Sequence, residues 1–366
     1  MRFTTSRDAL FKALQAVVGV VEKRQTMPIL SNLLLKVSGN ELEMTGTDLE
    51  LELINRLPVE DAADGAAAVP ARKLFDICRG LPDGASISFE LSEQRATLRS
   101  GRSRFVLATM SADEFPMLEG LEEGQQFDVS RDGLRKLIDR THFAMAHQDV
   151  RYYLNGLLLE ATPKRLRSVA TDGHRLALSD MQADLGVEGS LQIIVPRKAI
   201  TELQRLLDEG QEELRLFVTG NHLRVQLGAI RFTTKLIDGR FPDYERVIPE
   251  EGDKLLQGDR EPVRQALMRT AILSNEKFRG VRVSLAEGRL RLQAQNPDHE
   301  EAEEDMEVDY SGTPIEIGFN VNYLLDALGA MEGEQFTMEL SSPDSSGLLS
   351  DPADDSSRYV VMPMRL

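Results

Sequence analysis

The 366-residue sequence contains one cysteine, no tryptophan and few aromatic residues of any kind. Cys78 alone cannot form an intramolecular disulfide or a multi-cysteine metal site, so a reducing compartment is expected. No apolar run approaches the ~20 residues that span a bilayer. The first residues also lack the apolar core of a signal peptide. We therefore expect a soluble intracellular protein, cytoplasmic and without membrane contact.

Signatures of catalysis are also missing. The sequence has no phosphate-binding loop, nucleophile elbow, dinucleotide fingerprint or zinc-binding HExxH motif, and its five histidines lack metal-ligand spacing. Cys78 lies in an apolar helical pattern, which favours a small buried side chain over a nucleophile. Helix-turn-helix spacing, zinc fingers and RNA-binding aromatic strands are absent as well. These absences predict a protein that is not an enzyme and has neither cofactor nor metal.

The net charge of −17 argues against nucleic acid as a partner, if the charge is evenly spread. It is not evenly spread. The six predicted helical segments together carry +8, which leaves −25 for the rest of the chain. Five of the six are positive, and the exception is the segment 320–330, at −1. A basic surface built from helix faces would hold nucleic acid through phosphates, without reading sequence.

The chain carries one pattern three times, with a period of 124–129 residues. Three markers recur: Ser6-Arg7-Asp8, Ser130-Arg131-Asp132 and Asp259-Arg260-Glu261; Val69-Pro70 and Val195-Pro196; and Arg104-Phe105, Arg231-Phe232 and Arg358-Tyr359. Independent markers with one period indicate triplication of a domain.

Each copy predicts the order helix, strands, helix, strands. The first helices begin at N-cap candidates Ser6, Ser130 and Asp259, and the second helices begin near Pro70, Pro196 and Asn320. Alternating apolar strands follow, such as 33–37 and 42–45. The predicted fold class is α+β, with three tandem two-helix, antiparallel-sheet domains at residues 1–124, 125–250 and 251–366.

The string Thr171-Asp172-Gly173-His174-Arg175 is the most enzyme-like in the chain. Its counterpart in the first copy is Thr47-Asp48, which lacks the histidine. A turn in which the aspartate bonds its own backbone is therefore favoured. A catalytic Asp–His dyad and a part of a binding surface are the alternatives.

Two oppositely charged segments lie in different copies. Residues 298–307 are strongly acidic and residues 95–104 strongly basic. Each could simply be solvated. Facing one another across two chains, they would make a head-to-tail contact of the kind that closes rings. The tail, residues 359–366, is apolar to its end, which fits either a buried strand or a methionine-rich binding groove.

Five strings, spread over all three copies, closely resemble the bacterial DNA polymerase III beta subunit family, the replicative sliding clamps. They are DVRYYLNG (149–156), TDGHRL (171–176), FPDY (241–244), AILSNEK (271–277) and VVMPMRL (360–366). The resemblance implies a head-to-tail homodimer that forms a six-domain clamp ring around double-stranded DNA. It also implies peptide-mediated binding of the DNA polymerase III core, the clamp loader, other polymerases and repair proteins.

The resemblance further implies three sets of residues. The partner-peptide groove comprises Leu154, Thr171, Gly173, His174, Arg175, Leu176, Pro242, Arg246, Val247, Asn320, Tyr323, Ser346, Val360, Val361, Met362, Pro363, Met364, Arg365 and Leu366. The DNA-facing set comprises Arg24, Arg72, Arg79, Gln148, Arg151, Tyr152, Arg197, Lys198, Arg205 and Lys277. The dimer interface comprises Arg102, Arg104, Phe105, Leu107, Ile272, Leu273, Glu300, Glu301, Glu303 and Glu304.

Three hypotheses follow. The leading one is a processivity clamp that stays on DNA because its ring is closed. The second is an enzyme that uses Asp172 and His174, and the third is an acidic protein-only scaffold that never contacts DNA.

Overall fold

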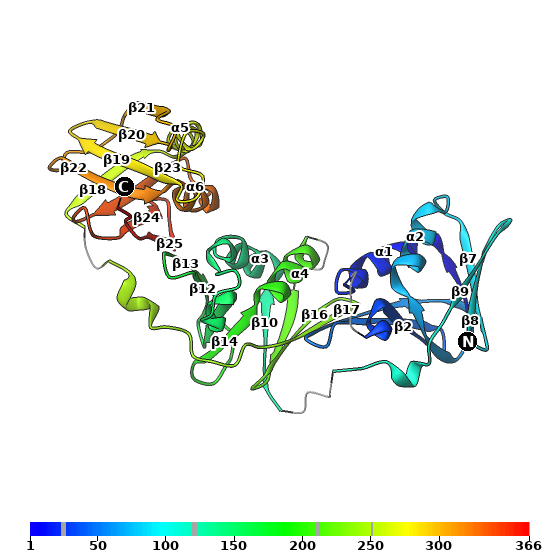
Figure 1. Ribbon diagram of the computed structural model, residues 1–366. Coiled ribbons are helices and arrows are strands. Elements are labelled where there is room, and N and C mark those ends of the chain that lie inside the picture. Colours follow the sequence, from blue (N-terminus) through cyan, green and yellow to red (C-terminus); the bar gives the residue numbers. More distant parts are fainter. Residues whose placement is uncertain (23–26, 119–122, 209–212, 250–251, 366) are drawn as a thin grey trace. The chain divides into compact units, whose positions relative to one another are not determined.

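The computed structural model describes residues 1–22, 27–118, 123–208, 213–249 and 252–365. Predicted site residues Arg24 and Leu366 lie outside this described part. Six α-helices are described (Figure 1): α1 (Arg7–Val18), α2 (Ala71–Gly80), α3 (Arg131–Asp139), α4 (Arg197–Leu207), α5 (Arg260–Ala271) and α6 (Val321–Ala330). In the described chain, no helix is long and apolar enough to cross a membrane.

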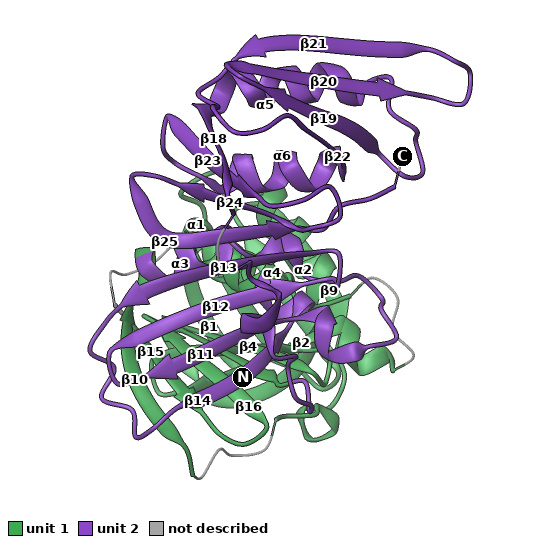
Figure 2. Cartoon of the chain, turned by 90° about the vertical axis from the view of Figure 1, so that its left-hand side faces the viewer, with its two compact units in different colours: residues 1–132, 201–236 green, residues 133–200, 237–366 purple. Residues whose placement is uncertain are grey.

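The chain divides into two compact units, which Figure 2 colours separately. Unit 1 comprises residues 1–132 and 201–236, and it holds two antiparallel sheets. The five-stranded sheet has the order β5 (Glu60–Ala63), β1 (Arg2–Ser6), β7 (Ser86–Ser92), β8 (Arg95–Ser100), β9 (Ser103–Ala108). The eight-stranded sheet has the order β10 (Gln125–Ser130), β15 (Glu213–Val218), β16 (His222–Leu227), β17 (Ile230–Lys235), β4 (Leu51–Pro58), β3 (Glu41–Thr47), β2 (Asn32–Ser38), β6 (Gly65–Pro70).

Unit 2 comprises residues 133–200 and 237–366, and it also holds two antiparallel sheets. Its eight-stranded sheet has the order β14 (Leu191–Pro196), β11 (Gly156–Thr162), β12 (Arg165–Thr171), β13 (Arg175–Gln182), β25 (Asp354–Val361), β24 (Gly347–Asp351), β23 (Gln335–Leu340), β18 (Lys254–Asp259). Figure 2 shows these strands side by side. The four-stranded sheet has the order β21 (Glu301–Glu307), β20 (Arg289–Gln295), β19 (Gly280–Ala286), β22 (Ile315–Asn320).

The predicted α+β class is confirmed, and each of the three copies contains the predicted run of helix, strands, helix, strands. Each copy also begins with a strand before its first helix (β1, β10 and β18), which the sequence did not predict. Two long sheets join strands of neighbouring copies: β17 pairs with β4, and β13 pairs with β25. Because these pairings run through the junctions between copies, the two compact units do not follow the three-copy division.

The repeated arginine marker has a structural role. Arg7 donates to the carbonyls of Cys78 and Arg79 at the end of α2, with Nε to the Cys78 oxygen at 2.8 Å. Arg260, its counterpart in the third copy, donates to the carbonyls of Leu328 and Gly333 around the end of α6. Helix ends leave carbonyls unsatisfied, and a cation there also suits the helix dipole. The first helix of these copies therefore binds the end of the second.

The helices begin where the sequence predicts, but not every predicted N-cap residue caps its helix with its side chain. The Ser6 hydroxyl accepts from the Ala9 amide at 3.2 Å, and the Asn320 side chain accepts from the Asn322 amide at 3.0 Å. Asp259 occupies the N-cap of α5, but its carboxylate caps nothing because it binds the Gln335 amide instead. Pro70 is the N-cap residue of α2, one position before the first helical residue.

Candidate functional site

A buried apolar cluster in unit 2 joins strands of the second and third copies. Leu154, Leu176 and Val360 belong to it and are at most 3% exposed. Leu176 of β13 lies directly opposite Val360 of β25, so the sequence-distant tail completes the sheet. Beyond β25, the Met362 amide donates to the His174 carbonyl at 2.9 Å and the Met364 amide to Gly318 at 2.8 Å. Backbone hydrogen bonds therefore hold the tail as far as Met364.

The predicted groove residues differ in how far their side chains are exposed to solvent. Besides the three cluster members, Val361 is buried. Half-buried are Thr171, Gly173, Arg175, Asn320, Tyr323, Ser346, Pro363 and Met364. Exposed are His174, Pro242, Arg246, Val247, Met362 and Arg365. The described members all belong to unit 2; the buried ones are apolar, and the exposed ones are both polar and apolar.

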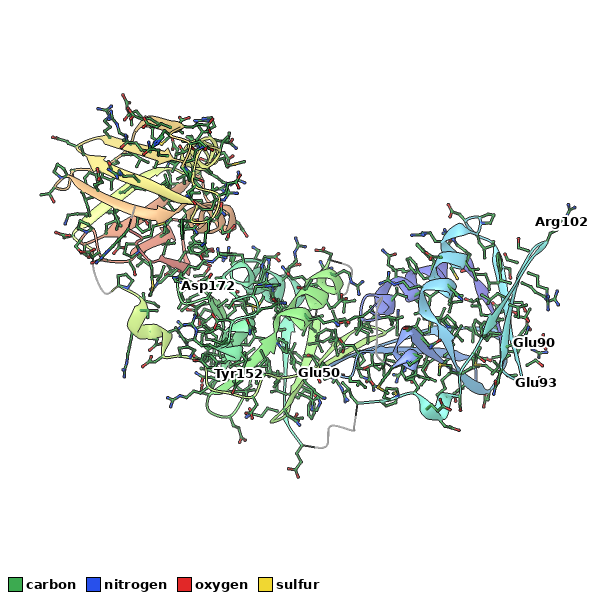
Figure 3. All side chains as sticks on the ribbon, viewed as in Figure 1. Glu50, Glu90, Glu93, Arg102, Tyr152 and Asp172 are labelled. Carbon is green, nitrogen blue, oxygen red and sulfur yellow. The ribbon has the colours of Figure 1, made fainter. Side chains whose placement is uncertain are left out.

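The Thr-Asp string forms a turn. The Asp172 Oδ1 atom accepts from the amides of His174 and Arg175, at 2.9 and 3.1 Å, and Thr171 Oγ1 donates to the Arg175 carbonyl at 2.6 Å. Thr47 and Asp48 make the equivalent bonds in the first copy. The interpretation as a structural turn is confirmed. Asp172, which lies between β12 and β13, is labelled in Figure 3.

Arg175 is the central polar residue of this region. Its side chain is 12% exposed and pairs with Asp172 and with Asp326 of α6. It also donates to the Phe143 carbonyl at 2.6 Å and lies 4.4 Å from the Tyr323 ring centroid. Because its donors are used within the chain, Arg175 positions neighbouring elements of unit 2.

A cavity of about 370 Å³ opens beside Arg175. Its lining includes the predicted site residues His174, Arg175, Arg197 and Tyr323 and the turn residue Asp172. It also includes residues to which the sequence reasoning assigned no role: Phe143, Met145, Ala146, His147 and Asp149. The missed group comes mainly from one loop, 143–149. Its position depends on Asn155, whose amide binds the Asp149 backbone carbonyl at 2.9 Å. The string DVRYYLN was the available signal, because it contains both partners.

The predicted DNA-facing loop is preorganised. Arg151 binds Asp149 through Nε and Nη2, at 3.0 and 2.9 Å, and these bonds hold the pKa of the Asp149 carboxyl at about 2. Gln148 has a left-handed backbone, with φ 56°, and is exposed. Tyr152 is 57% exposed and is labelled in Figure 3. The loop therefore presents Gln148 and Tyr152 to solvent.

Several other predicted DNA-facing cations contact carbonyls within their own unit. Arg72 donates to the Val21 carbonyl at 3.2 Å, and Arg197 donates to Met145 at 3.1 Å. Arg205 donates to Gln15 and Ala16 at the end of α1. Of the rest, Arg79 pairs with Asp76, Lys277 lies 5.2 Å from the Phe278 ring centroid, and Lys198 is half-buried. The predicted DNA-facing residues are divided between the two units.

Most of the predicted interface residues lie on or beside two edge strands, β9 and β21. Phe105, half-buried, and Leu107, 8% exposed, lie on β9, which pairs only with β8 in the described chain. Arg102 lies at the tip of that hairpin (Figure 3), and Arg104 is exposed on β9. β9 is the last strand of the five-stranded sheet, and β21 is the first strand of the four-stranded sheet. As edge strands, β9 and β21 each leave one row of backbone groups available for pairing.

Most of the remaining interface residues lie on or near β21. Glu301, Glu303 and Glu304 are on the strand, and Glu300 precedes it. Within its own chain, Glu304 accepts from Arg269 at 2.6 Å. Ile272 and Leu273, just after α5, are 75% exposed and half-buried, respectively. Among the described residues, no group of His, Cys, Asp or Glu could hold a metal ion.

Comparison with known proteins covers the whole chain. Models of the DNA polymerase III beta subunit match in order: the N-terminal domain over residues 1–119, the central domain over 128–243 and the C-terminal domain over 245–365. The beta sliding clamps of Pseudomonas putida and Escherichia coli K12 are 54% and 50% identical, over all of both chains.

Solved structures agree. A Pseudomonas aeruginosa sliding clamp bound to griselimycin superposes with a TM-score of 0.97 at 54% identity, covering all of both chains. A Caulobacter crescentus clamp superposes with a TM-score of 0.95 at 41% identity, with the same coverage. The resemblance predicted from the sequence is confirmed, and the chain belongs to the DNA polymerase III beta subunit family, the beta sliding clamps.

Proposed function

We propose that this chain is a processivity clamp: two copies close head to tail into a six-domain ring that encircles duplex DNA and tethers the replicative polymerase. The chain performs no chemistry of its own. The ordered match of three beta-subunit domain models along the full chain carries this proposal. Domain bounds of 1–124, 125–250 and 251–366 are proposed with it, and the ring works in the cytoplasm, at the nucleoid.

The ring closes through its edge strands. In the proposed contact, β9 of one copy pairs with β21 of the other, and the Phe105 and Leu107 side chains pack on Ile272 and Leu273. The unpaired backbone of both strands and the exposure of Ile272 support this pairing. Arg102 and Arg104 then face the glutamates at 300, 301, 303 and 304. Head-to-tail contacts of this kind close when their rotation permits.

DNA is held by phosphate contacts alone. The positive helical segments and the −25 on the remaining chain support a ring whose lining attracts DNA while its other surfaces repel it. The lining comprises the ten DNA-facing residues named above. Several of their guanidinium groups also bind carbonyls, which keeps the lining rigid and the hold on phosphate weak.

Partners bind at the groove. The buried floor formed by Leu154, Leu176 and Val360 and the exposed Val247 and Met362 suit apolar side chains of a short peptide. We propose that the polymerase III core, the clamp loader, other polymerases and repair proteins use this groove in turn. Griselimycin is bound to the Pseudomonas aeruginosa clamp, and we propose that on this chain it binds in the groove.

A retention experiment tests the ring. The protein is loaded on circular DNA with its loader, the salt concentration is raised, and half of the sample is then linearised. Encirclement predicts retention on circles and release from linear DNA. Equal retention of the protein on circular and on linearised DNA would refute topological binding. Charge reversal at Arg197, Lys198 and Arg205 should impair loading, whereas a protein-only scaffold would show no DNA association to lose.

A further inference from the structure

The segment η5 (Tyr244–Val247) supplies exposed groove residues and has little internal support. It is a single 3₁₀ turn, and the Ile248 amide reaches the Glu245 carbonyl at 3.3 Å. Val247 is 41% exposed, and the Arg246 side chain is 83% exposed. Arg246 also pairs with Asp243 at 2.7 Å, but both side chains are exposed and such pairs contribute little. Because short 3₁₀ turns have poor hydrogen-bond geometry, a contact between the turn and the sheet must fix its orientation.

That contact is made by Tyr244. Its side chain is 6% exposed and belongs to the same apolar cluster as the groove floor. The ring meets Phe241 edge to face, with centroids 6.4 Å apart. Its hydroxyl oxygen accepts a hydrogen bond from Nη1 of Arg167, on β12, at 3.2 Å. The turn is therefore joined to the sheet by an apolar contact and a charged hydrogen bond.

The Arg167 guanidinium is itself fixed. Asp180 lies directly opposite on β13 and accepts from Nε at 2.6 Å and from Nη2 at 2.7 Å. This bidentate pairing sets the guanidinium plane, and Nη1 is left to reach Tyr244. The Arg167 side chain is 12% exposed, so solvent competes little for these bonds. Glu245 lies 3.5 Å from Nη1 but is 70% exposed, and its contribution is small.

We propose that Tyr244 is a positioning residue of the partner groove, held through its hydroxyl by the Arg167–Asp180 pair. It determines the position of Val247 and Arg246 relative to the groove floor, and thereby the affinity of the groove for an apolar side chain of a partner. This inference rests on the proposed groove. Tyr244 acts through η5 and touches no partner itself.

The test compares single-atom changes, with griselimycin as the probe. Tyr244→Phe removes the hydroxyl and keeps the ring in the cluster. A hydrogen bond to a charged group is stronger than one between neutral groups, and part of its loss reaches the groove through the turn, so griselimycin should bind about 3- to 10-fold more weakly. The loss should lie in faster dissociation. Amide hydrogen exchange at Ile248 should rise several-fold, while exchange in β12 and β13 stays as in the parent protein.

Two further variants separate positioning from general stability. Asp180→Asn frees the guanidinium without touching Tyr244, and it should weaken griselimycin binding in the same direction. Tyr310→Phe is the matched control, because that hydroxyl donates to the Thr313 carbonyl, in a different segment from η5. It should leave griselimycin affinity and Ile248 exchange unchanged.

The outcomes are distinguishable. If griselimycin fails to bind the parent protein, the proposed groove is wrong. If the parent binds but Tyr244→Phe matches it in affinity and in Ile248 exchange, the positioning role is refuted and the groove stands. An equal effect of Tyr310→Phe would also refute it, because the change would then be a global loss of stability.

Discussion

Removal of two apolar side chains should dissociate the ring. In the single chain, Ile272 is 75% exposed and Leu273 is half-buried, so association buries most of the first and part of the second. Full burial of such a side chain contributes ~1.5–3 kcal/mol, so the double variant Ile272→Ala with Leu273→Ala should lose about 3 kcal/mol per interface. A closed ring has two such interfaces, so the free energy of dimerisation should weaken by about 6 kcal/mol, which raises the dimer Kd roughly 10⁴-fold.

Sedimentation velocity over a dilution series from micromolar to nanomolar concentration measures this directly. The parent chain should stay dimeric, and the double variant should sediment as a monomer with an unchanged circular dichroism spectrum. Leu255→Ala is the matched control, since Leu255 is an apolar side chain of β18, 51% exposed and outside the predicted interface. An intact dimer of the double variant at the lowest concentration would contradict the assigned interface.

Three further outcomes are expected. Gly156→Ala should destabilise the fold by about 1–3 kcal/mol in denaturant melts, because a Cβ there would lie 2.7 Å from the Val195 carbonyl oxygen. Burial raises the pKa of the Cys78 thiol to about 12, so Ellman's reagent at pH 8 should react only after unfolding; rapid reaction of the native protein would contradict that burial. Deletion of residues 362–366 should abolish griselimycin binding in calorimetry and leave the fold intact, because Val360 and Val361 remain in β25; unchanged affinity would place the site elsewhere.

Secondary structure and turns were predictable from the sequence, because they depend on the side chains of neighbouring residues. The three-copy pattern, the helix starts and the Thr171–Asp172 turn follow from spacing and side-chain type, and the described hydrogen bonds bear them out. Asp259 marks the limit of such reasoning. Its position suits an N-cap, but a glutamine 76 residues away takes its carboxylate. A long-range competitor of this kind has no local signature.

Tertiary partners also explain the rest of the site. Arg151 has the charge expected of a DNA contact, yet Asp149 binds it, and only the folded loop brings the two into this geometry. Likewise, the contribution of Tyr244 to the groove depends on the cross-strand register of Arg167 and Asp180. Sheets that run through the copy junctions could not be predicted from the repeat, because the repeat describes each copy by itself.

The most direct test of the central claim is the mass of the chain in solution, measured together with a low-resolution scattering envelope. A closed head-to-tail ring predicts twice the chain mass of 40.8 kDa and an envelope with a central hole wide enough for duplex DNA. A particle of single-chain mass, or a dimer whose envelope has no hole, would contradict the account.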